Sequence, residues 1–322
     1  MERRVIENRQ LFGILTMFMI VQFAGLALAT LWFNGASFQQ VQSTQVINTP
    51  VNALLLIAYI IFLAIGMLVL FRFYRGVKIY VIIEALVLFI ASFYVFLVIL
   101  AYITQSSLAA GIGAIILSVA LIVSKNKWPK LKNVAAIIAS IGVGAVLGFS
   151  FSFIAALIFM VLLAVYDFIA VFITKHMLTL ANVVTENNLA FMVDMNEVEA
   201  VPRSSFTSKE LREYESAIKT RKSRLSRHPA VEKAKNLGLV PVSANVALGT
   251  GDLAIPLMVA VAAFKVSLSF VLSFFVVFGA VIGLVITMFI LRRYKRALPA
   301  IPPLLLGVAI GLGLYYVFYM LL

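Results

Sequence analysis

The most constraining feature of this sequence is its division into long apolar runs separated by mostly short polar stretches. Hydrophobic residues make up 63% of the 322 residues and charged residues only 12%, whereas roughly 25% of the residues in soluble domains are charged. A run of about 20 apolar residues is long enough to cross a bilayer as a helix. The sequence therefore predicts an all-α polytopic membrane protein that needs no soluble core.

We expect nine transmembrane helices, because nine runs reach or approach the length that a bilayer requires. They cover residues 11–33, 50–71, 79–103, 108–124, 133–149, 152–174, 243–264, 267–291 and 300–321. The two short runs in the middle contain small residues, which suit close packing of membrane helices. These residues are Gly111, Gly113, Gly142, Gly144 and Gly148.

The domain organisation follows from the same runs. Residues 1–322 form a single membrane domain in this interpretation. Spans one to six lie within 1–174, a polar cytoplasmic loop covers 175–241, and spans seven to nine lie within 242–322. We expect the polar loop to be a solvated linker.

The basic residues predict the orientation of the chain. Every Lys and Arg except Lys265 falls on one side of the nine spans. The positive-inside rule assigns that side to the cytoplasm. The N-terminus is then cytoplasmic and the C-terminus extracytoplasmic. The net charge of +13 is explained by this topology, so the expected surface partner is the lipid bilayer and not nucleic acid.

Two aspartates lie inside apolar runs, where an ionisable side chain is costly and usually functional. Asp167 lies eight residues before Lys175, and Asp252 lies eleven residues after Pro241. If both segments are helical, the helical rise places them about 12 Å and at most about 16 Å from the same membrane face. Two carboxylates at similar depth can share one proton, which is sufficient equipment for peptide hydrolysis without a metal, serine or cysteine.

The residues around Asp252 are unusual for a helix interior. Gly249 and Gly251 precede it and Pro256 follows it, so the helix is loosened on both sides. Loose backbone at membrane depth is tolerated only where it is buried in protein or lines water. The last span opens with the prolines of 299–303, which indicate either a helix start with proline in its first turn or an extended segment that binds a substrate strand.

Three short motifs follow one another along the chain: Tyr166-Asp167, then Gly249-Thr250-Gly251-Asp252, then Pro299-Ala300-Ile301. They resemble the YD, GxGD and PAL motifs on spans six, seven and nine of the presenilin and signal peptide peptidase family of intramembrane aspartyl proteases. The third motif has Ile where the family has Leu, which keeps size and apolarity. Residues 166–171 are more similar to the presenilin branch, and the short loops resemble a compact microbial, archaeal-like homologue in a cell membrane.

The resemblance implies an intramembrane aspartic endopeptidase that hydrolyses peptide bonds in or near transmembrane segments of membrane proteins. It implies that Asp167 and Asp252 are catalytic, with an activated water and with no metal or cofactor. The implied active-site motif and substrate-binding residues are Tyr166, Gly249, Thr250, Gly251, Pro299, Ala300 and Ile301. A homo-oligomer and partner subunits are left open.

The alternative is a cation or proton transporter or channel. Glu84 lies six residues after Lys78, about 9 Å from the same membrane face by helical rise. Glu84, Asp167 and Asp252 at comparable depth would then form one ion path. In a protease, Glu84 is expected instead to be an accessory residue with a polar partner.

Overall fold

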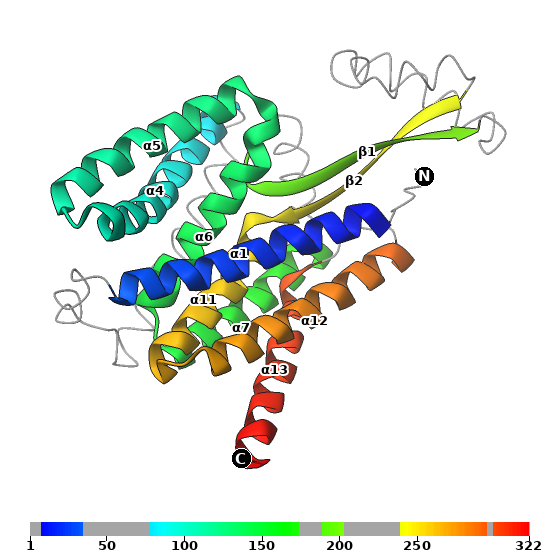
Figure 1. The fold of residues 1–322 in the computed structure, drawn as a ribbon. Coiled ribbons are helices and arrows are strands. Elements are labelled where there is room, and N and C mark those ends of the chain that lie inside the picture. The colour runs from blue at the N-terminus through cyan, green and yellow to red at the C-terminus, as the bar shows by residue number, and fades with distance from the viewer. Residues whose placement is uncertain (1–7, 35–76, 174–188, 203–238, 295–298, 322) are drawn as a thin grey trace. The chain divides into compact units, whose positions relative to one another are not determined.

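A computed structural model describes residues 8–34, 77–173, 189–202, 239–294 and 299–321 of the chain (Figure 1). Within these ranges, eight helices are long and apolar enough to cross a membrane. Each corresponds to one of the nine expected spans, and the remaining expected span, 50–71, lies outside the described residues. The chain is therefore a multi-pass membrane protein whose described spans are all helical.

The helices are α1 (Asn8–Asn34), α4 (Val77–Thr104), α5 (Ser107–Lys127), α6 (Lys132–Ser150), α7 (Phe153–Phe168), α11 (Thr250–Ser267), α12 (Phe270–Tyr294) and α13 (Ile301–Leu321). A short 3-10 turn, η1 (Pro129–Leu131), precedes α6, and a π-helical turn, η2 (Ile169–Ile173), continues α7. The strands are β1 (Met192–Pro202) and β2 (Leu239–Gly249).

The chain divides into two compact units, the first of residues 1–14 and 194–247 and the second of residues 15–193 and 248–322. In the first unit, the start of α1 packs on β1, since a Cβ added at Gly13 would collide with the side chain of Met195. Strands β1 and β2 pair in a two-stranded sheet and run antiparallel (Figure 1).

The described membrane spans are all helical, as expected, and the sheet adds two strands at 192–202 and 239–249, in and beside the stretch 175–241 where a solvated linker was expected. Alternation of polar and apolar residues, the local sign of a half-buried strand, is confined to short stretches, residues 193–196 and 197–200 of β1 and 242–246 of β2. The two strands are stabilised by pairing with each other, although they are far apart in sequence. Such non-local pairing leaves little trace in a single segment.

In the second unit, α11 is the central helix. It contacts α6, α7, α12 and α13, and every side chain from Leu253 to Phe264 is buried. Because α11 is apolar on all sides, it can be enclosed by other helices. Its position fixes the neighbourhood of Asp252, which belongs to its first turn.

Small residues bring the neighbouring helices close to α11 and α4. A Cβ at Gly144 or Gly148 of α6 would lie 2.8 Å from a backbone carbonyl oxygen of α11. Gly142 of α6 meets the backbone of Ala91 on α4 in the same way. The packing role predicted for these three glycines is confirmed. For Gly111 of α5 the role stays a prediction, since no described atom lies within 4 Å of a Cβ added there.

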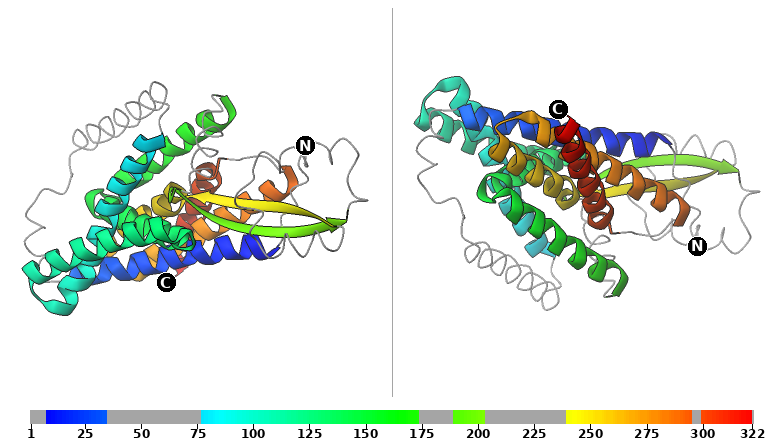
Figure 2. Two further views of the ribbon diagram at one scale, coloured as in Figure 1. Left: turned by 90° about the horizontal axis from the view of Figure 1, so that it is seen from above. Right: turned by 90° about the horizontal axis from the view of Figure 1, so that it is seen from below.

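A second seam joins α12 to α13. Gly279 and Gly283 of α12 meet Gly307 and Gly311 of α13 with backbone against backbone, as small residues allow in membranes. Figure 2 shows α13 crossing α12 when the molecule is seen from below. Gly283 also lies against the backbone of Pro303 and Leu304, so this seam positions the first turn of α13.

Candidate active site

Asp252 lies in the first turn of α11. Gly249 is the extended residue that caps the helix, with φ −63° and ψ 144°, and its N–H donates a hydrogen bond to the Asp252 carboxylate. The side chain of Asp252, the third residue of the helix, thus accepts a bond from the backbone of the capping residue, as in one half of a capping box. The positive end of the helix dipole also favours a carboxylate here.

This geometry corrects the expected span 243–264, whose depth estimate for Asp252 counted eleven residues from Pro241 and applied only if that segment is helical throughout. The structure has strand up to Gly249 and helix from Thr250. Glycine is a poor helix former, and the residues before Gly249 are paired with β1. A depth derived from helical rise therefore does not apply to Asp252.

Asp167 is the penultimate residue of α7 and is buried. The Ile301 N–H donates a hydrogen bond to Asp167 Oδ2 at 3.2 Å, and the Ala300 N–H donates a second one to the same carboxylate. Two residues after Asp167, at Ile169, the helix changes to the π-helical turn η2, a feature that is frequent at functional sites.

The first turn of α13 explains why those two N–H groups bind Asp167. Pro302 and Pro303 have no N–H, and the Leu304 N–H bonds to the Ala300 carbonyl at 3.2 Å. The two donors left at this helix start are therefore those on Asp167. Of the two interpretations of 299–303, a helix start with proline in its first turn is confirmed, and an extended segment is wrong from Ile301 onward.

The two aspartates lie close enough for the charge of Asp167 to act on Asp252. Asp167 is buried and Asp252 is partly exposed. Each carboxylate accepts backbone N–H bonds at a helix start, Asp252 on α11 and Asp167 on α13. The arrangement presents two neighbouring acids that helix dipoles and amides orient.

The other motif residues are placed around this pair. The Thr250 N–H and Oγ1 both donate to the Phe191 carbonyl, at 3.0 Å and 3.1 Å. A Cβ at Gly249 would lie 3.0 Å from Asp252 Oδ2, whereas no described atom lies within 4 Å of a Cβ at Gly251. Tyr166 precedes Asp167 on α7, and its side chain is 41% exposed.

Sequence reasoning missed three groups that contact α11 near Asp252. Gln22 of α1 is buried and its Nε2 donates to the Leu253 carbonyl at 2.9 Å. Ser140 Oγ of α6 lies 3.2 Å from the Thr250 carbonyl. A polar side chain in an apolar run was the available signal for both. The Phe191 carbonyl carries no sequence signal, because every residue has one.

Glu84 does not join the two aspartates. Its Oε1 lies 2.5 Å from Lys125 Nζ, and in the described part of the chain no group of three or more acidic, histidine or cysteine side chains is arranged as a metal site. The expectation of a polar partner for Glu84 is confirmed. The single three-acid site that an ion path requires is not formed among these residues.

Comparison with known families decides the class of protein. A family model described as "Signal-peptide peptidase, presenilin aspartyl protease" matches residues 15–321. The chain belongs to this family. It is a presenilin-family intramembrane aspartyl protease, as its three motifs predicted.

Solved structures agree with this membership in fold. The chain is similar to a presenilin family intramembrane aspartate protease in a C222 crystal form, with 20% identity and a TM-score of 0.61, covering 96% of this chain and 99% of that one. A P2 crystal form of such a protease gives 21% identity and a TM-score of 0.59, covering 95% and 97%. No curated protein matches the chain.

Proposed function

We propose that Asp167 and Asp252 are the catalytic dyad of this protease and that its substrates are transmembrane segments of other membrane proteins. The observation that supports the proposal is the proximity of the two carboxylates, each held by backbone N–H groups at the start of a helix. We propose that the two carboxylates, whose charges act on each other, share one proton, because ionising both is unfavourable.

The proposed reaction uses one proton and one water. The ionised carboxylate removes a proton from water as the water oxygen attacks the scissile carbonyl carbon. The protonated carboxyl donates its proton to the carbonyl oxygen. The tetrahedral gem-diol then loses the C–N bond. The leaving nitrogen takes the water-derived proton from the first aspartate, and one hydroxyl returns its proton to the second aspartate as the C=O bond re-forms, which restores the pair. Either aspartate can serve as the base in this scheme.

The substrate is proposed to approach as an extended strand. A transmembrane helix hides its peptide bonds in internal hydrogen bonds, so the scissile region has to unwind before hydrolysis. Strand β2 ends at Gly249, three residues before Asp252, and the space over Gly251 is open among the described atoms. A strand added beside this backbone would be bound by main-chain hydrogen bonds.

The remaining motif residues have proposed roles around this strand. Gly251 lets the substrate backbone approach, since a side chain there would occupy the open space, and Gly249 leaves room for the Asp252 carboxylate beside the bound strand. Ala300 and Ile301 orient Asp167 through their amides. Tyr166, Thr250 and Pro299 are proposed to shape the same site. The setting is proposed to be a microbial cell membrane, with the basic loops in the cytoplasm.

The test is a paired assay on one preparation of purified protein in liposomes. A single-span peptide is added, its products are identified by mass, and cation and proton flux are followed in the same vesicles. The proposal predicts cleavage within the membrane segment and no flux above that of empty vesicles. Flux that disappears in Glu84→Gln and Asp252→Asn, without peptide cleavage by the unmodified protein, would support the transporter instead.

A further inference from the structure

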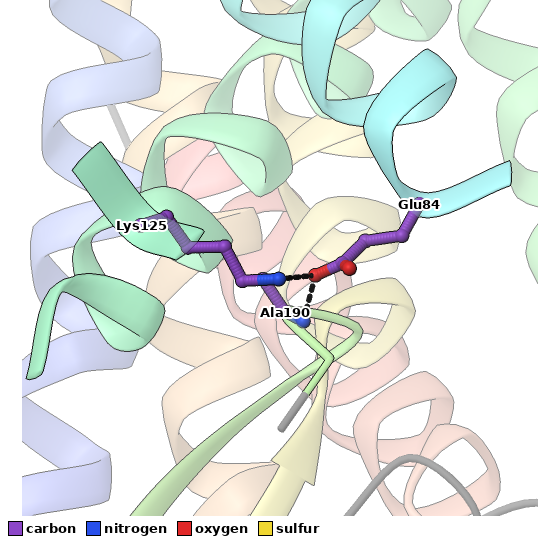
Figure 3. Close-up of polar contacts among 3 residues, drawn as sticks. All are labelled: Glu84, Lys125 and Ala190. Atoms are coloured by element: carbon purple, nitrogen blue, oxygen red, sulfur yellow. Dashed lines mark hydrogen bonds and ion pairs between the residues drawn. The ribbon is translucent and has the colours of Figure 1, made fainter. Parts of the chain in front are cut away.

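A buried ion pair joins α4 to α5 away from the two aspartates. Glu84 belongs to α4 and Lys125 to the last turn of α5, and their side chains are 3% and 5% exposed. Figure 3 shows the Lys125 ammonium directed at Glu84. Removing two charges from water usually offsets the attraction between them, so such a pair adds little net stability. Holding α4 to α5 is therefore not a sufficient explanation for this ion pair.

The same carboxylate oxygen has a second partner. The Ala190 N–H donates to Glu84 Oε1 at 2.5 Å, and Figure 3 shows both bonds meeting at this oxygen. Ala190 is buried, and its neighbour Leu189 packs against Tyr80 of α4. Glu84 therefore fixes the backbone that leads into β1 against the beginning of α4.

The fixed segment in turn holds the start of α11. Phe191, the residue after Ala190, accepts both the N–H and the hydroxyl of Thr250. Thr250 is the first residue of α11 and lies two positions before Asp252. A continuous series of contacts thus begins at the hydrogen bond between Glu84 and Ala190 and follows the backbone to Phe191. It ends at the two hydrogen bonds from Thr250, in the first turn that carries Asp252.

We propose that Glu84 and Lys125 are positioning residues for Asp252. Glu84 supplies the acceptor that fixes Ala190 and hence the Phe191 carbonyl, and Lys125 neutralises Glu84 so that a carboxylate can serve there inside an apolar segment. This inference rests on the proposed catalytic role of Asp252. The competing explanation is a clip that only holds α4 to α5, at the end of the hairpin opposite its Gln105–Ser106 connection.

Two double variants separate these explanations. Glu84→Gln/Lys125→Met and Glu84→Met/Lys125→Met both remove both charges and keep similar side-chain lengths. Only the variant with Gln at position 84 keeps an amide oxygen, which can still accept the Ala190 N–H. The single variants are less informative, because each leaves a buried charge without its partner.

The readouts are kcat and KM for a single-span peptide, together with the thermal unfolding midpoint. We expect Glu84→Gln/Lys125→Met to keep kcat within about threefold of the unmodified protein, and Glu84→Met/Lys125→Met to lose about tenfold or more at nearly unchanged KM, because misplacing a catalytic group acts on the chemical step. Equal kcat for the two folded double variants would overturn the inference and assign the pair to the helix hairpin.

A second pair of variants applies if Glu84→Met/Lys125→Met does not fold. Thr250→Val removes the hydroxyl that bonds to Phe191, and Thr250→Ser keeps it. A lower kcat for Val than for Ser supports the inference, and equal values overturn it. The proposed function has its own check in the same assay: no cleavage by the unmodified protein, or persistent cleavage by Asp252→Asn, contradicts the dyad, whereas either outcome for the double variants leaves the dyad unaffected.

Discussion

The backbone N–H of Ile301 donates a hydrogen bond to the carboxylate of Asp167, 134 positions earlier in the chain. The Pro-Ala-Ile segment therefore acts on Asp167 through its main chain. The two prolines that follow remove the competing amides of the helix start. This relationship gives the third motif a physical role that does not depend on the Ile side chain.

Ile301→Pro should lower kcat strongly. Proline is well tolerated at the first position of a helix, but it has no N–H for Asp167. A hydrogen bond to a charged group contributes about 1.5–3 kcal/mol, so the loss in kcat should be about tenfold to a hundredfold. Ile301→Leu keeps the amide and is the control. Steady-state cleavage of a single-span peptide measures both, and equal kcat in the two variants would contradict the role of the amide.

Gly249→Ala and Gly251→Ala should affect different kinetic constants. A Cβ at Gly249 would lie 3.0 Å from Asp252 Oδ2, so it should displace the carboxylate and lower kcat about tenfold or more. A Cβ at Gly251 meets no described atom within 4 Å. It should hinder only the approaching substrate and raise KM. Identical effects of the two substitutions on kcat and KM would argue against this placement of Asp252.

Gly283→Ala should destabilise the protein and lower its activity together. A Cβ there would press on the backbone of Pro303 and Leu304, and overpacking costs about 1–3 kcal/mol. The displaced helix start would move the Ile301 amide away from Asp167. Gly313→Ala on α13 is the control, because no described atom lies within 4 Å of its Cβ. Thermal unfolding and peptide cleavage should show a loss for Gly283→Ala alone.

The C-terminus should lie outside the cytoplasm. All Lys and Arg residues except Lys265 fall on one side of the nine expected spans, and such asymmetry sets orientation. An epitope tag attached after Leu322 should be digested by protease added outside intact cells. Protection of the tag there, with digestion after lysis, would refute the proposed topology.

Much of the helical framework was predictable from sequence, because a bilayer requires long apolar runs and the runs are long. The eight described helices fall where the apolar runs predicted them. Asp167 and Asp252 were identifiable because an acid in an apolar run is costly. Close packing at Gly142, Gly144 and Gly148 was predictable for a similar reason, since only small residues let two helix backbones meet.

The sequence did not predict the features that depend on distant partners. Strand β2 replaces the expected start of span seven, because its residues pair with β1 across a long separation. The bond from Ile301 to Asp167 depends on how α13 meets α7. Lys125 was expected among the cytoplasmic cations, and the structure buries it against Glu84. Each of these outcomes is decided by tertiary contacts and not by local propensity.

The most direct test of the account is cleavage of a single-span peptide by purified Asp167→Ala and Asp252→Ala in liposomes, beside the unmodified protein. Each substitution removes one of the two carboxylates that the reaction requires. Both variants should be expressed and folded, as judged by thermal unfolding, and neither should yield either cleavage product. Substantial cleavage by either folded variant would contradict the proposed dyad.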